Sequence, residues 1–543
     1  MACSPLLQQN ETQALPNYRL CTMDSWCGKL LTSVVVLPFM AGNCRTRRNG
    51  SRYYDCLISS RVLFLVVFAI VIVFTASKRI PSHTQIRLGF VLLLLTLLMI
   101  TAMTCIFVLG YLVNKHGLQS IVAAKRNTST PKLQVIFLWM FGLATVFYCG
   151  FLLAKQIECS IYISGGYFWN IVLFFNTLLI ICLFIQMIFI TYFSPYELEP
   201  TDLVNCTMSM LLAGNVSIFV YVNIMGNTLS TIIDIDPDND IARCLKNNST
   251  MILLLEKSSS ILRPNFTEFV LLSCTILLEI WSPTKVQHPN GEVPYIEISD
   301  INDSERSSLL SSETTTEHSR NEGRRTACQL ITLIISIALG LGQVVCYVVM
   351  AMDIGDVNSM RYVSEVYELV LKAMIVLAIF IGFFCLVQYC SPDRSSQGLK
   401  TWEHVYLLSA FGLFMMHICE CIGGDVSSDI SAKMLMSTSI ISIFQDYLQV
   451  VFLLHANRCK KCDPRSNINL LESVLIFTMI SNFMFWFNDS FLITEFPVNR
   501  ILEHDDFSKD LLNVVYEIFL PVSVFFRFTS FLEYYATFGK YNA

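Results

Sequence analysis

Charged side chains are scarce in this sequence. Asp, Glu, Lys and Arg together make up 15% of its 543 residues, whereas a soluble domain carries about 25%. Hydrophobic residues make up 54%, and Phe alone occupies 39 positions. So little charge excludes a soluble enzyme held to the membrane by a single anchor. The composition instead predicts a polytopic membrane protein.

The sequence also lacks the motifs of several functional classes. No phosphate-binding Walker sequence is present, which argues against an ATP-driven pump. The Cys-Lys-Lys-Cys stretch at residues 459–462 has no second pair of Cys or His residues to complete a metal site. We therefore expect no cofactor, and nothing in the sequence predicts a nucleic-acid partner.

Long apolar runs dominate what is present. A membrane span needs about 20 apolar residues. Six runs of that kind precede residue 283, at residues 57–77, 88–113, 133–155, 167–192, 203–228 and 258–282. Six more follow residue 325, at residues 326–352, 361–390, 401–423, 432–457, 469–491 and 509–538. The sequence predicts an all-α polytopic membrane protein with about twelve transmembrane helices in two six-helix repeats.

The two sets of spans define four regions of the chain. Residues 1–56 are predicted to form a cytosolic N-terminal segment, and residues 57–282 the first six-helix half. Residues 283–325 contain a polar stretch rich in Ser and Thr that cannot bury a core, so we predict a flexible cytosolic linker. Residues 326–543 are predicted to form the second half.

Lys and Arg in short loops indicate the orientation. Basic residues gather before the first span, between spans two and three, and between spans ten and eleven. With twelve spans these segments share one side, which we assign to the cytosol together with both termini. Asn247 and Asn248 then lie on the outer side, as glycosylation acceptors require.

Buried amides recur at matching places in the two halves. Gln186 lies in the fourth span and Gln449 in the tenth, at similar depth. Asn215 and Asn482 lie near the middle of the fifth and eleventh spans. Interhelical hydrogen bonds contribute only about 0.6 to 2 kcal/mol to helix association. These amides are therefore better suited to lining a polar, partly hydrated seam between helices than to holding the helices together. The competing interpretation is that they only pack helices together.

Four stretches, taken in order along the chain, resemble the otopetrins, a family of proton-selective channels. They are LLAGN (211–215), RPNFTEFVLLSCTILLEIW (263–281), LQVVFLLHA (448–456) and FLPVSVFFRFTSFLEYY (519–535). Within them, Glu268 and Arg527 match residues of the family pattern. Two positions depart from it: Gly226 stands where an acidic residue is usual, and His455 replaces an Asp.

The resemblance implies a function and partners. It implies passive, proton-selective conduction across the plasma membrane, activated by extracellular acid. It also implies a homodimer in contact with membrane lipid, with sterol as a candidate, and sensitivity to external zinc. Zinc favours imidazole nitrogen and carboxylate oxygen, so His504 and Asp505 are the candidate zinc ligands. The competing interpretation is a solvated acidic loop.

Titratable side chains within the spans are the remaining candidates for a proton pathway or its gating. They are Glu268, His417, Glu420, Asp446 and Arg527. His titrates near neutral pH, which makes His417 a candidate sensor. Asp446 lies one helical turn from Gln449 and is predicted to belong to the same seam. Glu365, Glu368 and Lys372 share a helical face and are predicted to form a structural ion-pair network.

Two other functions fit parts of the sequence. A proton-coupled solute transporter would use the same twofold layout and the same buried acids. A membrane-embedded enzyme needs a nucleophile or base with an orienting partner. Glu403 and His404 are adjacent, but no recognisable catalytic motif surrounds them. We therefore predict a channel rather than an enzyme.

Overall fold

The structure is a computed structural model of the whole chain. It describes residues 44–46, 52–54, 62, 65–66, 84–118, 121–125, 130–160, 167–199, 201–225, 250–281, 315–351, 357–390, 401–426, 430–459, 468–491 and 509–542. Nearly all of these residues are helical. In lipid a backbone has to satisfy its own hydrogen bonds, and a helix does so within one segment.

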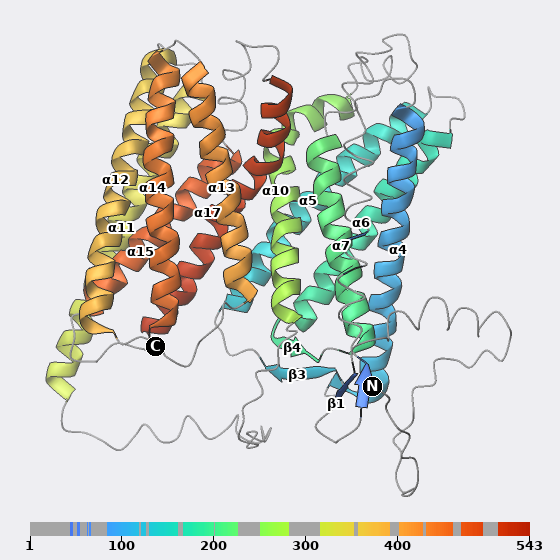
Figure 1. The fold of residues 1–543 in the computed structure, drawn as a ribbon, viewed down its shortest axis with the longest axis horizontal. Helices are drawn as coiled ribbons and strands as arrows, with labels where there is room; N and C mark the ends of the chain where they lie inside the picture. Colours follow the sequence, from blue (N-terminus) through green and yellow to red (C-terminus); the bar gives the residue numbers. More distant parts are fainter. Residues whose placement is uncertain are drawn as a thin grey trace, which may run out of the picture.

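The helices fall into two sets along the chain. The first set is α4 (Thr84–His116), α5 (Thr130–Ser160), α6 (Tyr167–Phe193), α7 (Asp202–Met225) and α10 (Thr250–Ile280). The second set is α11 (Thr315–Ala351), α12 (Val357–Tyr389), α13 (Thr401–Val426), α14 (Ile430–Arg458), α15 (Ile468–Phe491) and α17 (Lys509–Asn542). Figure 1 shows the two sets as neighbouring groups, coloured blue to green and yellow to red.

Ten of the described helices are long and apolar enough to cross a membrane. The remaining one, α17, occupies the place of the predicted twelfth span. The predicted first span, residues 57–77, lies almost wholly outside the described residues. Large apolar side chains such as Leu97 and Phe107 are exposed on α4, as expected of a surface that meets lipid. The chain is therefore an all-α polytopic membrane protein, as the sequence predicts.

The same helix contacts occur in both halves, as expected for two repeats. α4 packs on α6 and α7, and α12 packs in the same way on α14 and α15. α5 lies against α6 and α10, and α13 lies against α14 and α17. Each sixth helix also contains a proline, Pro264 in α10 and Pro521 in α17. Positions counted from these prolines are therefore comparable between the halves.

The boundary between the halves differs in part from the prediction. α10 ends at Ile280, close to the predicted boundary at residue 282. α11 begins at Thr315, so residues 315–325, which we predicted as linker, are helical. Glu and Arg are good helix formers. This polar stretch therefore continues the membrane helix α11 at its N-terminal end. The rest of the predicted linker and most of residues 1–56 lie outside the described residues.

Two short antiparallel strand pairs were not predicted. β1 (Cys44–Thr46) pairs with β2 (Arg52–Tyr54). β3 (Val122–Lys125) follows α4 and pairs with β4 (Tyr196–Leu198), which follows α6. The second pair therefore joins the ends of two helices that also pack on each other.

An aromatic interface joins the two halves. α10 lies against α13, α15 and α17, and α17 also lies against α5 and α7. The Trp486 ring of α15 lies 6.4 Å from the Phe137 ring and 5.7 Å from the Phe141 ring, both on α5. Phe528 of α17 lies 5.4 Å from the same indole. These rings belong to the buried core of the first half, which thus continues into the second.

Gly382 in α12 offers a test of the packing in the second half. A Cβ there would lie 2.6 Å from two ring atoms of Phe452 on α14 and 3.1 Å from Val474 on α15. We expect Gly382→Ala to destabilise the protein by about 1–3 kcal/mol, the usual cost of overpacking. Gly150→Ala is the matched control, because nothing lies within 4 Å of a Cβ at that position. The measurement is the thermal unfolding midpoint of purified protein in detergent, and equal midpoints for the two variants would contradict the described packing.

Candidate functional site

A single hydrogen bond joins the two predicted amides of each half. Gln186 Nε2 on α6 donates to Asn215 Oδ1 on α7 at 3.1 Å. Gln449 Nε2 on α14 donates to Asn482 Oδ1 on α15 at 2.8 Å. All four side chains are buried. The fourth helix thus meets the fifth helix through the same pair of residue types in both halves.

Further polar groups extend the pair in the second half. Gln449 Nε2 also donates to Ser530 Oγ on α17 at 3.2 Å, and that hydroxyl lies 3.2 Å from Tyr406 OH on α13. Gln445 Nε2 donates to Gln449 Oε1 at 2.8 Å. Four helices therefore converge on one polar layer. We call Tyr406, Gln445, Gln449, Asn482 and Ser530 the second-half amide layer.

The first half has a smaller layer of the same design. Ser273 follows Pro264 by nine residues, and Ser530 follows Pro521 by nine residues. The Ser273 hydroxyl and Asn215 Nδ2 are buried without a hydrogen-bond partner in the part of the chain that the structure describes. Neither serine is among the predicted site residues, although their equal spacing from the helix prolines is visible in the sequence.

A buried ion pair lies next to the second-half amide layer. Asp446 precedes Gln449 by three residues, about 4.5 Å along α14. The Arg527 guanidinium donates to both carboxylate oxygens of Asp446, at 2.6 and 3.2 Å. Asp446 has no exposed surface, and Arg527 is 3% exposed. Of the two environments expected for Arg527, the membrane interface or a carboxylate partner, the structure shows the second.

His417 on α13 bridges two carboxylates. Its Nδ1 lies 2.9 Å from Glu420 Oε2, and its Nε2 lies 3.2 Å from Asp446 Oδ2. Ser439 Oγ donates to the same oxygen of Glu420 at 2.7 Å. A protonated imidazole donates from both nitrogens, whereas a neutral one donates from one. A proton gained or lost at His417 therefore changes hydrogen bonds on both sides of the ring.

The charged groups continue toward α11 and α12. Lys372 Nζ lies 2.6 Å from Glu368 Oε1 and donates to Ser442 Oγ on α14 at 2.6 Å. Tyr347 OH donates to Glu368 Oε2 at 3.2 Å. The sequence predicted the Glu368–Lys372 pair but did not place it beside His417. Asp489 on α15, also missed, interacts electrostatically with the same group. We call Tyr347, Glu368, Lys372, His417, Glu420, Asp446, Asp489 and Arg527 the charged vestibule.

Glu268 lies at the interface between the halves, away from this group. Its Oε1 accepts a hydrogen bond from Trp486 Nε1 at 3.2 Å. Its Oε2 is buried without a hydrogen-bond partner among the described residues. Glu268 belongs to the sixth span of the first half, and its carboxyl group thus meets the Trp486 indole of the second half.

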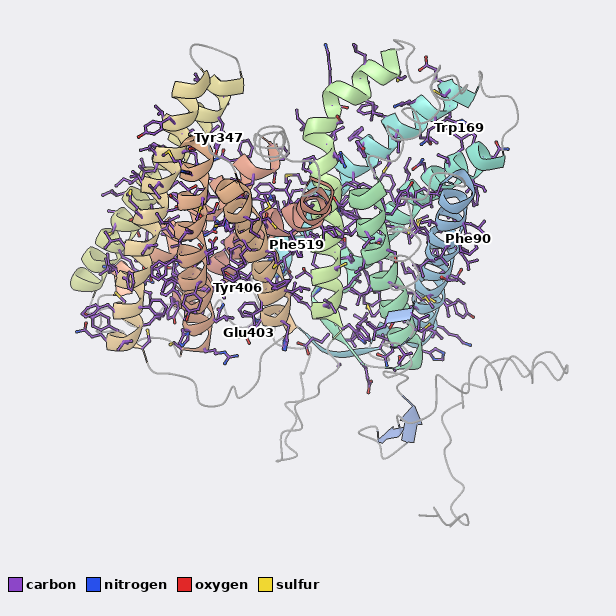
Figure 2. The ribbon with its side chains drawn as sticks, turned by 45° about the horizontal axis from the view of Figure 1, so that its top comes forward. Phe90, Trp169, Tyr347, Glu403, Tyr406 and Phe519 are labelled. Atoms are coloured by element: carbon purple, nitrogen blue, oxygen red, sulfur yellow. The ribbon has the colours of Figure 1, made fainter. Side chains whose placement is uncertain are left out.

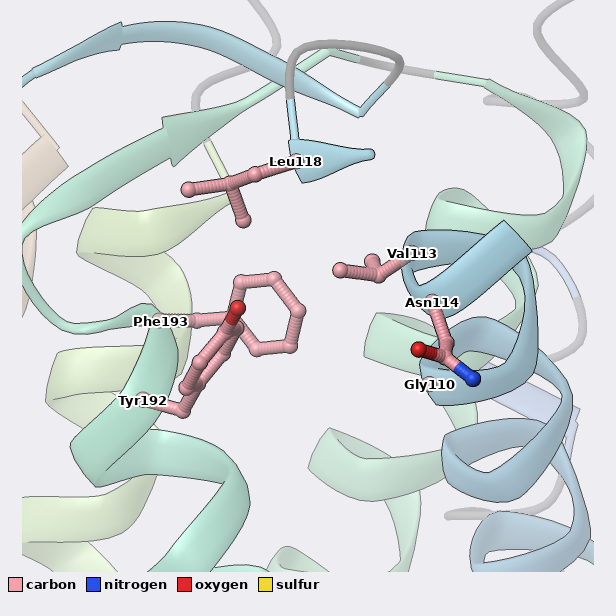
Figure 3. A pocket seen from close by; sticks show the side chains of 6 residues that line it. All are labelled: Gly110, Val113, Asn114, Leu118, Tyr192 and Phe193. Carbon is pink, nitrogen blue, oxygen red and sulfur yellow. The ribbon is translucent and has the colours of Figure 1, made fainter. Parts of the chain in front are cut away.

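A separate cleft lies at one end of the first half. It has a volume of about 370 Å³ and is lined by Gly110, Val113, Asn114, Leu118, Tyr192 and Phe193 (Figure 3). None of these residues carries a carboxyl, imidazole or amino group. The cleft therefore offers no charged group for proton transfer.

Some predicted sites fall outside the described residues. These are the zinc candidates His504 and Asp505, the glycosylation candidates Asn247 and Asn248, and the departing position Gly226. Within the described ranges, no three His, Cys, Asp or Glu side chains are grouped to hold a metal ion. His455 is exposed, and its Nδ1 bonds to the Val451 carbonyl of its own helix at 2.8 Å.

The polar groups of the second half form two consecutive layers that can pass a proton. Figure 2 shows Tyr347 toward one end of the half, and Tyr406 and Glu403 toward the other end. The charged vestibule lies on the Tyr347 side, and the amide layer lies at the level of Tyr406. Carboxylates and an imidazole take up and release protons, whereas amides and hydroxyls orient water. The arrangement suits proton transfer better than the binding of a large solute.

Comparison with known proteins identifies one related family. The family model described as Otopetrin matches residues 230–528, which is more than half of the chain. No curated protein matches the chain. The match includes α11 to α15 and therefore most of the charged vestibule and the amide layer.

Removing one partner of the buried ion pair tests its role in the fold. We expect Asp446→Leu to destabilise the protein by about 3–5 kcal/mol, because it leaves the Arg527 charge buried without its bidentate partner. Asp446→Leu combined with Arg527→Leu should recover much of this loss. Thermal unfolding in detergent measures both. If the Asp446→Leu variant alone were as stable as the wild type, the described ion pair would be contradicted.

Proposed function

Because the chain belongs to the otopetrin family, a family of proton channels, we propose that it is a proton-selective channel that conducts passively across the plasma membrane. The observation that carries the proposal is the direct succession of the charged vestibule and the second-half amide layer on α14. Protons move along hydrogen-bonded water, so a conducting path needs only a narrow wet passage with groups that orient the water. The two layers supply such groups on consecutive helical turns.

The vestibule residues act as relays in this proposal. A proton that reaches Glu420 passes to Nδ1 of a neutral His417, and the proton on Nε2 leaves toward Asp446. Arg527 holds the Asp446 carboxylate in place through its two hydrogen bonds. Beyond Asp446, the amides of Gln449 and Asn482 and the hydroxyl of Ser530 orient the water that carries the proton onward.

An aromatic layer on the far side of Gln449 forms the gate. Phe452 and Leu453 have no exposed surface, and the Phe452 and Tyr534 rings stack at 6.3 Å. Conduction requires these side chains to part. Acid reaching the vestibule protonates its carboxylates, which removes their charge and weakens the ion pairs that fix α14. Such a change favours movement of α14 and opening of the gate, and we therefore propose activation by extracellular acid.

We also propose an orientation, a subunit arrangement and a lipid environment for the channel. The vestibule faces the outside, and both termini are cytosolic, as the basic loops indicate. The channel works as a homodimer in contact with membrane lipid, with sterol as a candidate ligand. The proposed mechanism uses only carboxyl, imidazole, amide and hydroxyl groups and needs no cofactor. No covalent bond of a substrate is made or broken.

The first test is electrical recording from cells that express the chain. We expect an acidic bath to evoke an inward current in solutions whose other ions are replaced by large organic ions. Its reversal potential should move by about 59 mV per tenfold change in proton ratio, the value for one charge. Mock-transfected cells serve as the control. A current that requires an added organic solute would identify a proton-coupled transporter instead.

The second test is a substitution in the amide layer. Gln449→Leu removes donors to Asn482 and Ser530 and puts an apolar group in the path. We expect the current per surface protein to fall on the order of tenfold, which corresponds to about 1.4 kcal/mol of barrier. Tyr447→Leu is the matched control, because Tyr447 lies two residues away on α14 and is 56% exposed. Equal currents in the two variants would remove Gln449 from the path.

A further inference from the structure

The fourth helices of the two halves differ on the vestibule side of their glutamines. The positions three, seven and ten residues before Gln449 are Asp446, Ser442 and Ser439. The positions three, seven and ten residues before Gln186 are Leu183, Leu179 and Asn176. The face that is polar throughout in α14 is thus interrupted by two leucines in α6.

The leucines belong to an apolar layer in the first half. Leu179 and Leu183 are 4% and 3% exposed and belong to the buried core. On the described part of α4, the buried polar side chain is Thr96, whose hydroxyl donates to the Leu92 carbonyl of its own helix at 2.7 Å. The matching helix of the second half, α12, supplies a charged pair instead.

The apolar layer separates two polar regions of the first half. Toward the predicted outer end, Asn176 Nδ2 donates to Gln156 Oε1 at 2.7 Å. The next polar side chain on this face of α6 is Gln186, ten residues or about 15 Å further along the helix. Along α6, Gln186 is therefore separated from that end by side chains that offer water no hydrogen bonds.

At the depth of the apolar layer, the second half has buried polar side chains. Gln343 Oε1 and Ser364 Oγ are buried without hydrogen-bond partners among the described residues. Both side chains lie close to the Tyr347 hydroxyl of the charged vestibule. Buried polar atoms of this kind are usually satisfied by water, so water fits beside the Tyr347 hydroxyl.

We propose that protons pass through the second half alone, and that Leu179 and Leu183 close the first half on its outer side. This inference rests on the proposed function and names the route of the conducted proton. The bond between Gln186 and Asn215 then serves to tie α6 to α7. The charged vestibule is the single proton entrance of each subunit.

A matched pair of cysteine substitutions tests the route. Ser442→Cys places a thiol in the vestibule, and Leu179→Cys places one at the equivalent position of the first half. A small, positively charged methanethiosulfonate reagent is applied to the outside of intact cells during acid-evoked recording. It forms a mixed disulfide with an accessible thiolate and releases its sulfinate group. Wild-type channels treated in the same way control for the native cysteines.

We expect the reagent to reduce the Ser442→Cys current on the order of tenfold, because the added group fills a narrow path. The Leu179→Cys current should match that of treated wild type. Loss of current in Leu179→Cys, or an unaffected Ser442→Cys, would overturn the inference. If a variant carries no current, peptide mass spectrometry measures the labelled fraction at the introduced thiol, and labelling of Leu179→Cys equal to that of Ser442→Cys would likewise overturn it. A wild-type chain without acid current would overturn the proposed function instead.

Discussion

A polar atom that enters the interior of a membrane protein has to find its partner inside the protein, because lipid supplies none. In the second half this constraint falls mainly on α14. Ser442 of α14 forms a hydrogen bond with a side chain of α12. Asp446 forms hydrogen bonds with side chains of α13 and α17, and Gln449 with side chains of α15 and α17. Together these three positions bond to α12, α13, α15 and α17. α14 is thereby tied to four of the other five described helices of this half.

Stability alone does not explain these groups. Burying two charges costs several kcal/mol per ion, and well-packed hydrophobic residues often replace such a pair without loss of stability. The same chain provides the comparison, since α6 has Leu183 where α14 has Asp446. The first half folds with leucine at that position. The fold of a half therefore does not by itself require a charge at the equivalent place in α14.

Most of the architecture was predictable because it depends on simple periodic properties. Apolar runs predicted the helices, and the shared Gln and Asn positions predicted the amide pairs. Tyr406 and Ser530 were not predictable in that way, because hydroxyl residues are common in helices and their convergence depends on helix crossing. Arg527 meets Asp446 across 81 residues of sequence, a contact that no local pattern reveals. The strand pair β3–β4 was missed because its segments are too short to show alternation.

That strand pair has a mechanical consequence. Two helices that pack only through side chains can slide or splay at their ends at little cost. β3 follows α4 and β4 follows α6, and backbone hydrogen bonds clasp them together in the register Val122 to Leu198. The clasp therefore restrains the ends of α4 and α6 relative to each other, in addition to the packing of their side chains.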